Sequence, residues 1–333
     1  MDYFIGIDVS KKSLDLAVLS EGNILLERKI DNNLQTIRAF LKELITCREL
    51  SAEQIVVCME YTGIYNANVL EVLWKQRIRI CMEPAVRIKH SLGMVRGKTD
   101  RIDARRIVQY AYKNRQELVF WRPQRLIIQK MQALLSLRER LIRSKVQLEV
   151  PLKESVGFLD DSVIKAIRTN TQRIARGIKK EIKVVEKQLK ALVHQDCSVA
   201  NQLEQATSVP GIGPITALNM IITTGEFKRI TEPKKFACYS GVAPFEHRSG
   251  SSIRGKTRVS KMANMSIKRL LHMGAMSAVG SCPEMKAFYA RKTAQGKNKM
   301  SVLNAVRNKL ISRVFACVNS GRTYQTNYSH ALA

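Results

Sequence analysis

Four acidic residues stand where their carboxylates could act on one substrate. Asp8 and Glu60 each end a short apolar run, whereas Asp100 and Asp103 lie three apart at the start of a predicted helix. Residues i and i+3 share a helix face, so Asp100 and Asp103 can point the same way. Carboxylates suit hard cations, and two such ions about 3.5–4 Å apart stabilise the attacking and leaving oxygens of a phosphoryl transfer. The set predicts a site for one or two Mg²⁺ ions, with Mn²⁺ as an alternative.

Each of these acids also has a purely structural interpretation. Asp8 could be a turn residue and Glu60 a solvated strand end. Asp100 could complement the helix dipole, and Asp103 could pair with neighbouring arginines. Each structural interpretation is favoured for a residue taken alone. Together they are less convincing, because two strand ends and one helix start can converge in an α/β domain.

A second candidate is the hydroxyl-rich, basic segment that runs from His247 to Gly255. In the functional interpretation, one serine attacks a phosphodiester while arginines balance the developing charge. In the structural interpretation, Ser and Gly simply form a flexible loop. The basic residues that we expect to bind nucleic acid here are Arg248, Arg254, Lys256, Arg258 and Lys261.

A glycine-rich turn at residues 208–217 lies between two apolar segments. It contains Gly211 and Gly213 and resembles a helix-hairpin-helix, in which N–H groups of the turn and of the following helix bind backbone phosphate. A turn that merely connects two helices is an equally good interpretation.

The first third of the chain predicts an α/β domain with a mixed sheet. Strands are expected at 3–9, 14–19, 23–30, 54–60 and 78–82, and helices at 33–47, 64–76 and 100–114. Residues 54–60 form a continuous apolar run, as expected for a strand that is buried on both faces.

The remainder of the chain is expected to be mostly helical. Between Ile174 and Leu192, apolar residues recur every three or four positions, which predicts a heptad-like seam. A similar period runs from Met131 to Leu148, and Pro151 and Gly157 fall between the two runs. We therefore expect two long helices, either as an antiparallel coiled coil or as a helix pair on a globular core. The predicted divisions are 1–118, 119–195 and 196–333.

Charge points to a polyanionic partner. The 333 residues include 56 Lys and Arg against 28 Asp and Glu. The net charge is +4 over 1–118, +10 over 119–195 and +14 over 196–333. Nucleic acid is the first candidate partner. A membrane is disfavoured because no apolar stretch is long enough to span one. The seven scattered cysteines indicate neither disulfides nor a zinc site, and we expect a cytoplasmic protein.

Five motifs occur in a characteristic order. They are YFIGIDVS at 3–10, EYTG at 60–63, KTDRIDAR at 98–105, VPGIG at 209–213 and SGSSIRG at 249–255. In this the chain resembles the DEDD transposases of bacterial insertion sequences, a family that also contains the Piv-type DNA invertases. The resemblance covers nearly the whole chain.

The resemblance implies a RuvC-like domain with the RNase H fold, then a coiled-coil linker, then a C-terminal transposase domain. It implies that Asp8, Glu60, Asp100 and Asp103 form the catalytic, metal-binding tetrad and that Ser249 is the nucleophile. It further implies donor and target DNA as substrates, a structured guide RNA in many members, and composite sites shared between subunits. We expect a homodimer that becomes a tetramer on DNA.

Three other functions stay open. A Piv-type invertase would use the same residues. A RuvC-like junction nuclease would use the carboxylates with water as the nucleophile and leave Ser249 idle. A non-catalytic nucleic-acid-binding protein would keep its acids for structural reasons, and the intact carboxylate set argues against it.

Overall fold

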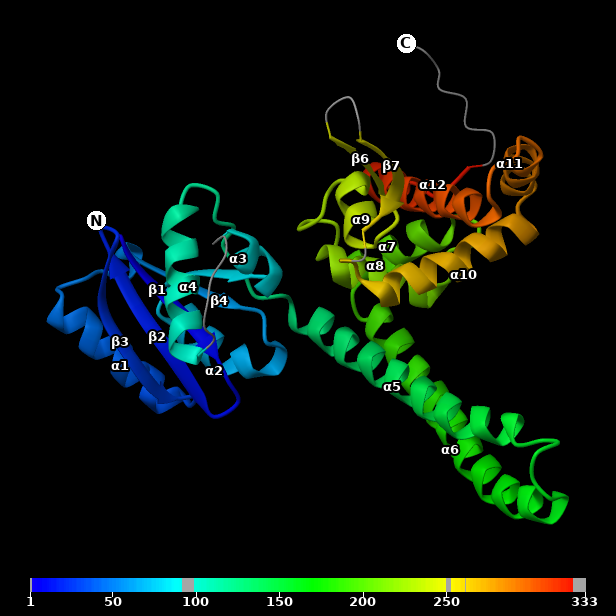
Figure 1. Cartoon of the computed structure of the whole chain (residues 1–333), viewed down its shortest axis with the longest axis horizontal. Coiled ribbons are helices and arrows are strands. Elements are labelled where there is room, and N and C mark those ends of the chain that lie inside the picture. Colours follow the sequence, from blue (N-terminus) through cyan, green and yellow to red (C-terminus); the bar gives the residue numbers. More distant parts are fainter. Residues whose placement is uncertain (1, 92–98, 250–252, 261, 326–333) are drawn as a thin grey trace, which may run out of the picture. The chain divides into compact units, whose positions relative to one another are not determined.

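The computed structural model describes residues 2–91, 99–249, 253–260 and 262–325. The chain divides into two compact units, residues 1–123 and 124–333, which we describe separately (Figure 1).

The first unit is built on a five-stranded mixed sheet. Its strands are β1 (Tyr3–Val9), β2 (Ser13–Ser20), β3 (Asn23–Asp31), β4 (Ile55–Glu60) and β5 (Arg79–Glu83). They lie in the order β3-β2-β1-β4-β5. β1, β2 and β3 pair antiparallel, whereas β4 runs parallel to β1 and to β5. The carboxyl ends of β1 and β4 therefore lie at the same edge of the sheet, which places Asp8 and Glu60 there.

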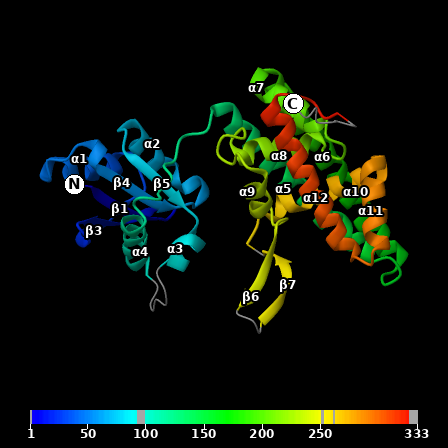
Figure 2. The ribbon, with the colours of Figure 1, turned by 90° about the horizontal axis from the view of Figure 1, so that it is seen from above.

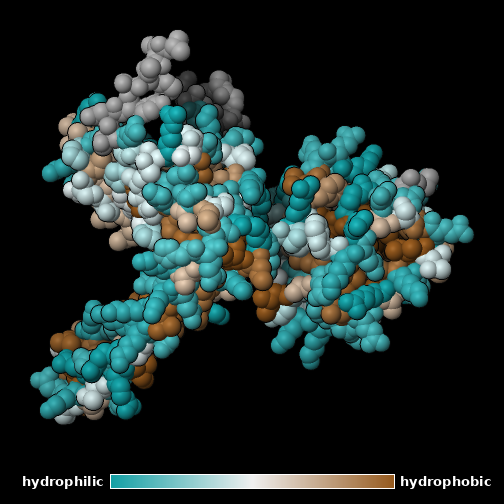
Figure 3. Space-filling view, turned by 180° about the vertical axis from the view of Figure 1, so that it is seen from behind, coloured by the Kyte–Doolittle hydropathy of each residue, from teal (hydrophilic) through white to brown (hydrophobic). Residues whose placement is uncertain are grey.

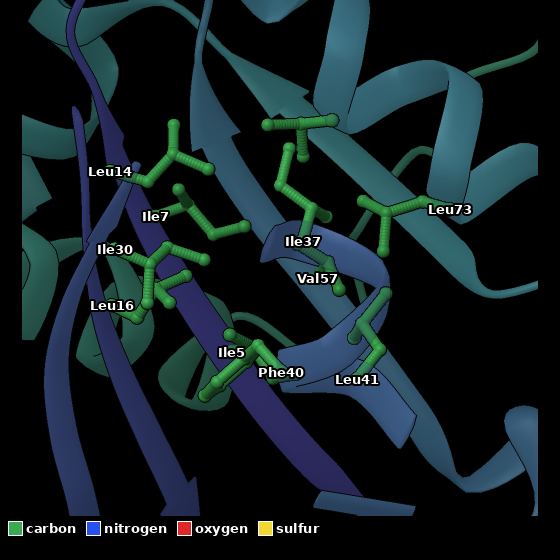
Figure 4. Close-up of a pocket in the computed structure, with 11 residues that line it drawn as sticks. Ile5, Ile7, Leu14, Leu16, Ile30, Ile37, Phe40, Leu41, Val57 and Leu73 are labelled. Carbon is green, nitrogen blue, oxygen red and sulfur yellow. The ribbon is translucent and has the colours of Figure 1, made fainter. Parts of the chain in front are cut away.

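Helices cover both faces of this sheet, as the alternation of buried side chains requires. On one face, Ile5 and Ile7 of β1 pack against α1 (Leu34–Cys47) and α2 (Ala67–Lys75). Figure 4 shows this aliphatic core, with Phe40 and Leu73 closing over the strands. The other face packs against α4 (Asp100–Lys113).

The predicted α/β domain is confirmed, and every predicted strand and helix of the first unit is present. Residues 64–76 begin with a short 3₁₀ turn, η2 (Gly63–Asn66), before α2. A second 3₁₀ turn, η1 (Ala52–Gln54), precedes β4. One helix was not predicted, α3 (Ala85–Ser91), whose seven residues are too few to show a clear period.

The second unit begins with two long helices, α5 (Leu126–Glu154) and α6 (Asp161–His194), which pack side by side as an arm. Pro151, which falls between the two apolar runs, lies inside the last turn of α5. Gly157 does lie in the connection, with φ +87°. The shared core holds residues 128–135 of α5 and 185–193 of α6, whereas Ile174 of the predicted seam is 49% exposed. A helix pair is thus established, and a coiled coil is not.

The rest of this unit is a helical body. Its helices are α7 (Cys197–Thr207), α8 (Pro214–Thr224), α9 (Pro233–Tyr239), α10 (Met265–Ser281), α11 (Pro283–Ala294) and α12 (Lys299–Ser320). They enclose a core around Phe236 and Phe315. No helix in the described part of the chain is long and apolar enough to cross a membrane.

One feature of this body corrects the sequence analysis. The segment expected to be a loop is a β-hairpin, formed by β6 (Pro244–Ser249) and β7 (Ile253–Val259). It projects from the helices (Figure 2). A two-stranded ribbon that stands in solvent needs no apolar face, so its sequence lacks the alternation that predicts a strand.

Candidate active site

A close contact between α4 and β1 sets the geometry of the site. A Cβ atom at Gly6 would lie 2.4 Å from the Ala104 carbonyl oxygen and 2.5 Å from the Val108 nitrogen. Only glycine therefore lets the α4 backbone lie directly on this strand. Positions 6 and 8 of β1 face the same way. The first turn of α4, which carries Asp100 and Asp103, consequently lies near Asp8.

The pKa of Asp8 reflects this arrangement of neighbouring acids. Its pKa is raised from 3.8 to about 6, first by burial and then by the negative charges of Asp100, Asp103, Glu60 and Asp15. Burial and nearby like charges both penalise an ionised carboxylate. The fold thus brings all four predicted acids into one electrostatic group, although they come from three separate elements.

Two residues that the sequence analysis missed belong to the same group. Asp15 of β2 lies directly across from Asp8 and is buried. Lys29 of β3 lies across from Asp15, with its Nζ 3.3 Å from Asp15 Oδ2 and 3.9 Å from Asp100 Oδ2. The Lys29 ammonium group thus places a positive charge beside the acids. In the sequence, the acidic Asp15 between the apolar Leu14 and Leu16 is a signal from which a site residue could have been predicted.

The loop after Glu60 is fixed by a buried amide. Asn66 Nδ2 donates to the Glu60 carbonyl oxygen at 3.0 Å. Its Oδ1 accepts from the Thr62 backbone N–H at 2.8 Å and from the Thr62 hydroxyl at 2.9 Å. These bonds hold the backbone that carries the Glu60 carboxylate.

The start of α4 fits both interpretations of its acids. Thr99 caps the helix by accepting from the Ile102 N–H, so the acids lie in the first turn and complement the helix dipole. Asp103 Oδ1 also accepts from Arg106 NH1 at 2.7 Å. The structural roles considered for Asp100 and Asp103 are thus present, and they do not prevent both charges from acting on Asp8.

Glu27 of β3 anchors the same helix turn. It accepts hydrogen bonds from Arg101 Nε at 2.8 Å and from Arg105 NH2 at 2.6 Å. The two guanidinium groups lower the pKa of Glu27 to about 2. Glu27 therefore ties α4 to the sheet edge next to Lys29.

Glu83, another acid at this sheet edge, has a structural role. It lies across from Glu60 in the register of β4 and β5, and it is buried. Arg87 NH1 donates to both of its carboxylate oxygens at 3.2 Å. Because this partner neutralises it within the fold, we assign Glu83 to folding rather than to the candidate site.

The donor chemistry of the four acids fits a divalent metal ion. All four offer hard oxygen ligands, and a bound cation would offset the burial and the neighbouring negative charges that raise the pKa of Asp8. Among the described residues, no three His, Cys, Asp or Glu side chains are arranged closely enough to hold a metal ion. The fit therefore rests on charge and ligand type.

Ser249 lies in the second unit and the tetrad in the first. Its backbone is the last position of β6 and pairs with Ile253 of β7, while Arg248 pairs with Arg254. Lys256 and Arg258 follow on β7, where Arg258 is exposed. Lys261 lies outside the described residues.

The glycine turn has a packing role at one position. Gly211 has φ +90°, and a Cβ there would lie 2.4 Å from the Gly274 carbonyl oxygen of α10. Helix packing thus explains Gly211. Gly213 has open space around it and lies just before Pro214, where α8 begins. The N-terminal end of α8 at Gly213 therefore stays a candidate for phosphate contact.

Comparison with known proteins matches both units to one family. A transposase model of the DEDD group matches residues 5–157, and a model described as the transposase IS116/IS110/IS902 family matches residues 203–290. Together they span more than half of the chain. The chain belongs to this transposase family. Because the members of such a family cut and rejoin DNA, the prediction of an enzyme that transfers DNA strands is confirmed at that level.

Individual relatives are more distant. The chain is 24% identical to the pilin gene-inverting protein of Moraxella bovis over 96% of this chain and 97% of that protein. It is also 24% identical to the transposase of insertion sequence element IS1111A of Coxiella burnetii over 68% of each chain. A solved structure of Thermus thermophilus RuvC with a Holliday junction substrate aligns with 36% of this chain, at 14% identity and a TM-score of 0.28.

Proposed function

We propose that the chain is a DNA recombinase whose RuvC-like first unit provides the phosphoryl-transfer site. Asp8, Glu60, Asp100 and Asp103 would act there together. The observation that carries this proposal is the geometry of the sheet edge, where β1 and β4 end with Asp8 and Glu60 and the close approach of α4 to Gly6 brings Asp100 and Asp103 near Asp8. The raised pKa of Asp8, caused by burial and by these neighbouring charges, agrees with it. A partly buried carboxylate whose pKa is raised beside other acids is typical of catalytic sites.

The four acids would hold one or two Mg²⁺ ions, or Mn²⁺ in their place. A bound ion supplies Lewis-acid stabilisation of charge on a phosphoryl oxygen. Glu27 and Gly6 set the position of α4 and hence of Asp100 and Asp103. Lys29 balances negative charge at the sheet edge.

Ser249 would be the nucleophile. Its Oγ would form a bond to the DNA phosphorus as the scissile P–O bond breaks. The serine loses its proton, and the departing DNA oxygen gains one. In the second step, a DNA hydroxyl attacks the phosphoserine, the Ser–O–P bond breaks, and Ser249 is regenerated. One phosphodiester replaces another, so no external energy source is needed. Arg248 and Arg254 would balance the developing negative charge.

Both DNA and RNA would bind largely to the second unit. Residues 119–333, which include the whole of that unit, carry a net charge of +24, which favours contact with phosphate backbones. The proposed substrates are donor and target DNA, and the proposed guide is a structured RNA from the flanks of the element. Such an RNA should outcompete unrelated RNA for the protein, in the cytoplasm where we expect the enzyme to act. Equal affinity for both at physiological salt would favour a guide-free invertase.

The arm is the proposed surface for assembly. Apolar side chains stay exposed along its outer half, and Figure 3 shows such patches on the arm. They include Val146, Val150, Phe158 and Ile174. A second copy would cover this surface in a dimer, and two dimers would meet on DNA as a tetramer. Sedimentation of the DNA-loaded protein tests this, and a particle that stays monomeric would contradict it.

A Piv-type invertase is the second candidate. The match to the Moraxella bovis protein over nearly the whole chain favours it, since that protein is named for inverting a pilin gene. The DNA beside the gene separates the two functions. An invertible segment there favours inversion, whereas element ends and a structured non-coding stretch favour transposition.

A strand-exchange assay with matched variants tests the proposed chemistry. Asp8→Asn should abolish exchange, whereas Asp31→Asn, an exposed acid on the same sheet, should leave it unchanged. Full exchange by Asp8→Asn would contradict the proposal. Cleavage that needs Asp8 but not Ser249 would instead identify a RuvC-like nuclease that uses water.

A further inference from the structure

Three large apolar side chains stand in solvent immediately after Glu60. We name residues 61–65 the tyrosine loop. In it, Tyr61 is 67% exposed, Ile64 is 82% exposed and Tyr65 is 39% exposed. Single exposed apolar residues need no explanation, but three within five residues beside a candidate active site do.

The backbone of the tyrosine loop is held in place. Its Thr62 is bound by the buried Asn66 amide through the two bonds described above. At its other end, the Tyr65 carbonyl oxygen accepts from Asn32 Nδ2 at 3.0 Å. A loop that is already ordered loses little entropy when a ligand covers it, so these exposed rings are suited to binding.

The same asparagine joins the loop to a basic turn. Asn32 Nδ2 also donates to the Ser10 carbonyl oxygen at 2.9 Å, and the Asn32 N–H donates to the Lys12 carbonyl oxygen at 2.9 Å. Asn68 Nδ2 in turn donates to the Asn32 carbonyl oxygen at 2.9 Å. Lys11 and Lys12 are exposed. The loops that follow Asp8 and Glu60 are therefore locked together, one basic and the other aromatic.

We propose that the tyrosine loop binds unstacked bases of a single-stranded DNA segment, while Lys11 and Lys12 hold its phosphates. Aromatic rings combined with basic side chains are how proteins bind single strands without sequence preference. An exposed aliphatic tip such as Ile64 can also enter a base step as a wedge. This inference rests on the proposed function, because it takes the tetrad as the place where DNA is cut.

The ligand follows from position and charge. The loop begins one residue after Glu60, so a strand whose phosphate reaches the tetrad would bring its neighbouring bases to Tyr61. The loop itself carries no acid, and the adjoining turn is positive. A second copy of this chain is the alternative occupant. The test separates it from DNA.

The experiment uses the full chain with single-stranded oligonucleotides that carry 2-aminopurine at successive positions. EDTA is present, so no cleavage is required. Fluorescence of 2-aminopurine reports stacking of that base, and it is not masked by backbone binding to the basic second unit. We expect the 2-aminopurine emission to change at one or two positions of the oligonucleotide when the protein binds. An excess of duplex DNA should not reproduce this change.

Matched variants separate stacking from other effects. Tyr61→Ala with Ile64→Ala should abolish the fluorescence change and weaken the site by about 5- to 100-fold, as expected for one lost stacked base. Tyr61→Phe keeps the ring and should retain the signal, as should Leu25→Ala, an exposed control on the same unit. The Tyr61 and Ile64 side chains are mostly exposed, so the melting curves of their variants should not move.

Two outcomes would overturn the inference. One is an unchanged 2-aminopurine signal in the double variant. The other is a double variant that loses self-association while its signal and its affinity for single strands stay unchanged, which would assign the loop to a second copy. If Asp8→Asn still exchanges strands fully while the wild type shows stacking, the proposed function fails and the base-binding loop stands. If stacking fails while exchange is intact, only the loop assignment fails.

Discussion

Gly6 of β1 lies directly beneath Ala104 of α4, so close that a methyl group at position 6 would lie 2.4 Å from the Ala104 carbonyl oxygen. This contact lets Asp100 and Asp103 approach Asp8. It links one small residue in a buried strand to the electrostatics of the whole candidate site.

Gly6→Ala should therefore push α4 away from the sheet. We expect the free energy of unfolding to fall by about 1–3 kcal/mol, as for other overpacked cores. Strand exchange should be lost along with it. Chemical denaturation measures the first and the exchange assay the second.

The matched control is Gly177→Ala in α6, where an added Cβ would meet nothing within 4 Å. Alanine should stabilise that helix by about 0.5–1 kcal/mol. Equal effects of the two substitutions on the free energy of unfolding would show that the close approach of α4 to Gly6 does not matter for stability.

Asp8 should make stability depend on pH. Its pKa is about 6 in the folded chain against 3.8 ordinarily, so the unfolded chain ionises first as the pH rises. The metal-free protein therefore loses stability between about pH 4 and pH 6, and the cost persists above pH 6.

Asp8→Asn removes this cost. At pH 7.5 it should stabilise the metal-free protein by about 1–2 kcal/mol, a value reduced from the full shift because the group is only partly buried. The gain should vanish near pH 4. Melting curves across this range test it, with Asp31→Asn as the control, and a gain that is the same at pH 4 and pH 7.5 would be a contrary result.

Glu27→Gln should loosen the first turns of α4. The variant keeps the shape of the side chain but loses the charge that Arg101 and Arg105 share. Because both arginines are largely exposed, we expect a loss of stability of about 1 kcal/mol or less. Strand exchange should fall several-fold, since Asp100 and Asp103 lie on this helix.

The pH dependence of this contact has the opposite sign. The pKa of Glu27 is lowered from 4.5 to about 2, so its contribution is present above pH 4.5 and is lost as the pH falls towards 2. Glu43→Gln, which breaks an ion pair with Arg28 elsewhere on the unit, should leave exchange intact. If both variants reduced exchange alike, a positioning role for Glu27 would be untenable.

Arg125 should be important for the second unit. At the start of α5 it donates to Asp196 Oδ2 at 2.6 Å and to Glu226 Oε2 at 3.0 Å. Glu226 is buried, so Arg125→Ala would leave a buried charge without this partner. We expect a loss of about 1–3 kcal/mol, discounted because Arg125 itself is partly exposed.

Arg143→Ala provides the comparison for Arg125, because its pair with Glu139 is a surface contact within one helix. It should cost about 0.5 kcal/mol or less. Thermal melting of both variants compares these two losses of stability. An Arg125 variant as stable as the Arg143 variant would mean that Glu226 is accommodated without its partner.

The sheet and its helices were predictable because their side chains alternate between two buried faces. Ile5, Ile7 and Phe4 reveal both faces of β1 at once, and the acids at the ends of β1 and β4 follow from that assignment. The convergence of Asp8 and Glu60 is a consequence of parallel strands ending at one edge.

Other features depend on register and could not be read from local pattern. Asp15 and Lys29 join the site only because β1, β2 and β3 pair so that positions 8, 15 and 29 lie in one row. The hairpin of Ser249 was missed because a ribbon in solvent lacks an apolar face. Asn66 was missed because its buried amide binds local backbone, which no periodicity reveals.

The covalent protein–DNA adduct on denaturing gels tests the central claim most directly, namely that Ser249 and the Asp8 tetrad act in one reaction. The wild-type chain should form a protease-sensitive adduct, whereas Ser249→Ala should bind DNA normally and form none. Asp8→Asn should also form none, while Ser251→Ala and Ser252→Ala should form it as the wild type does. An adduct from Ser249→Ala, or normal recombination by all three serine variants, would contradict the account.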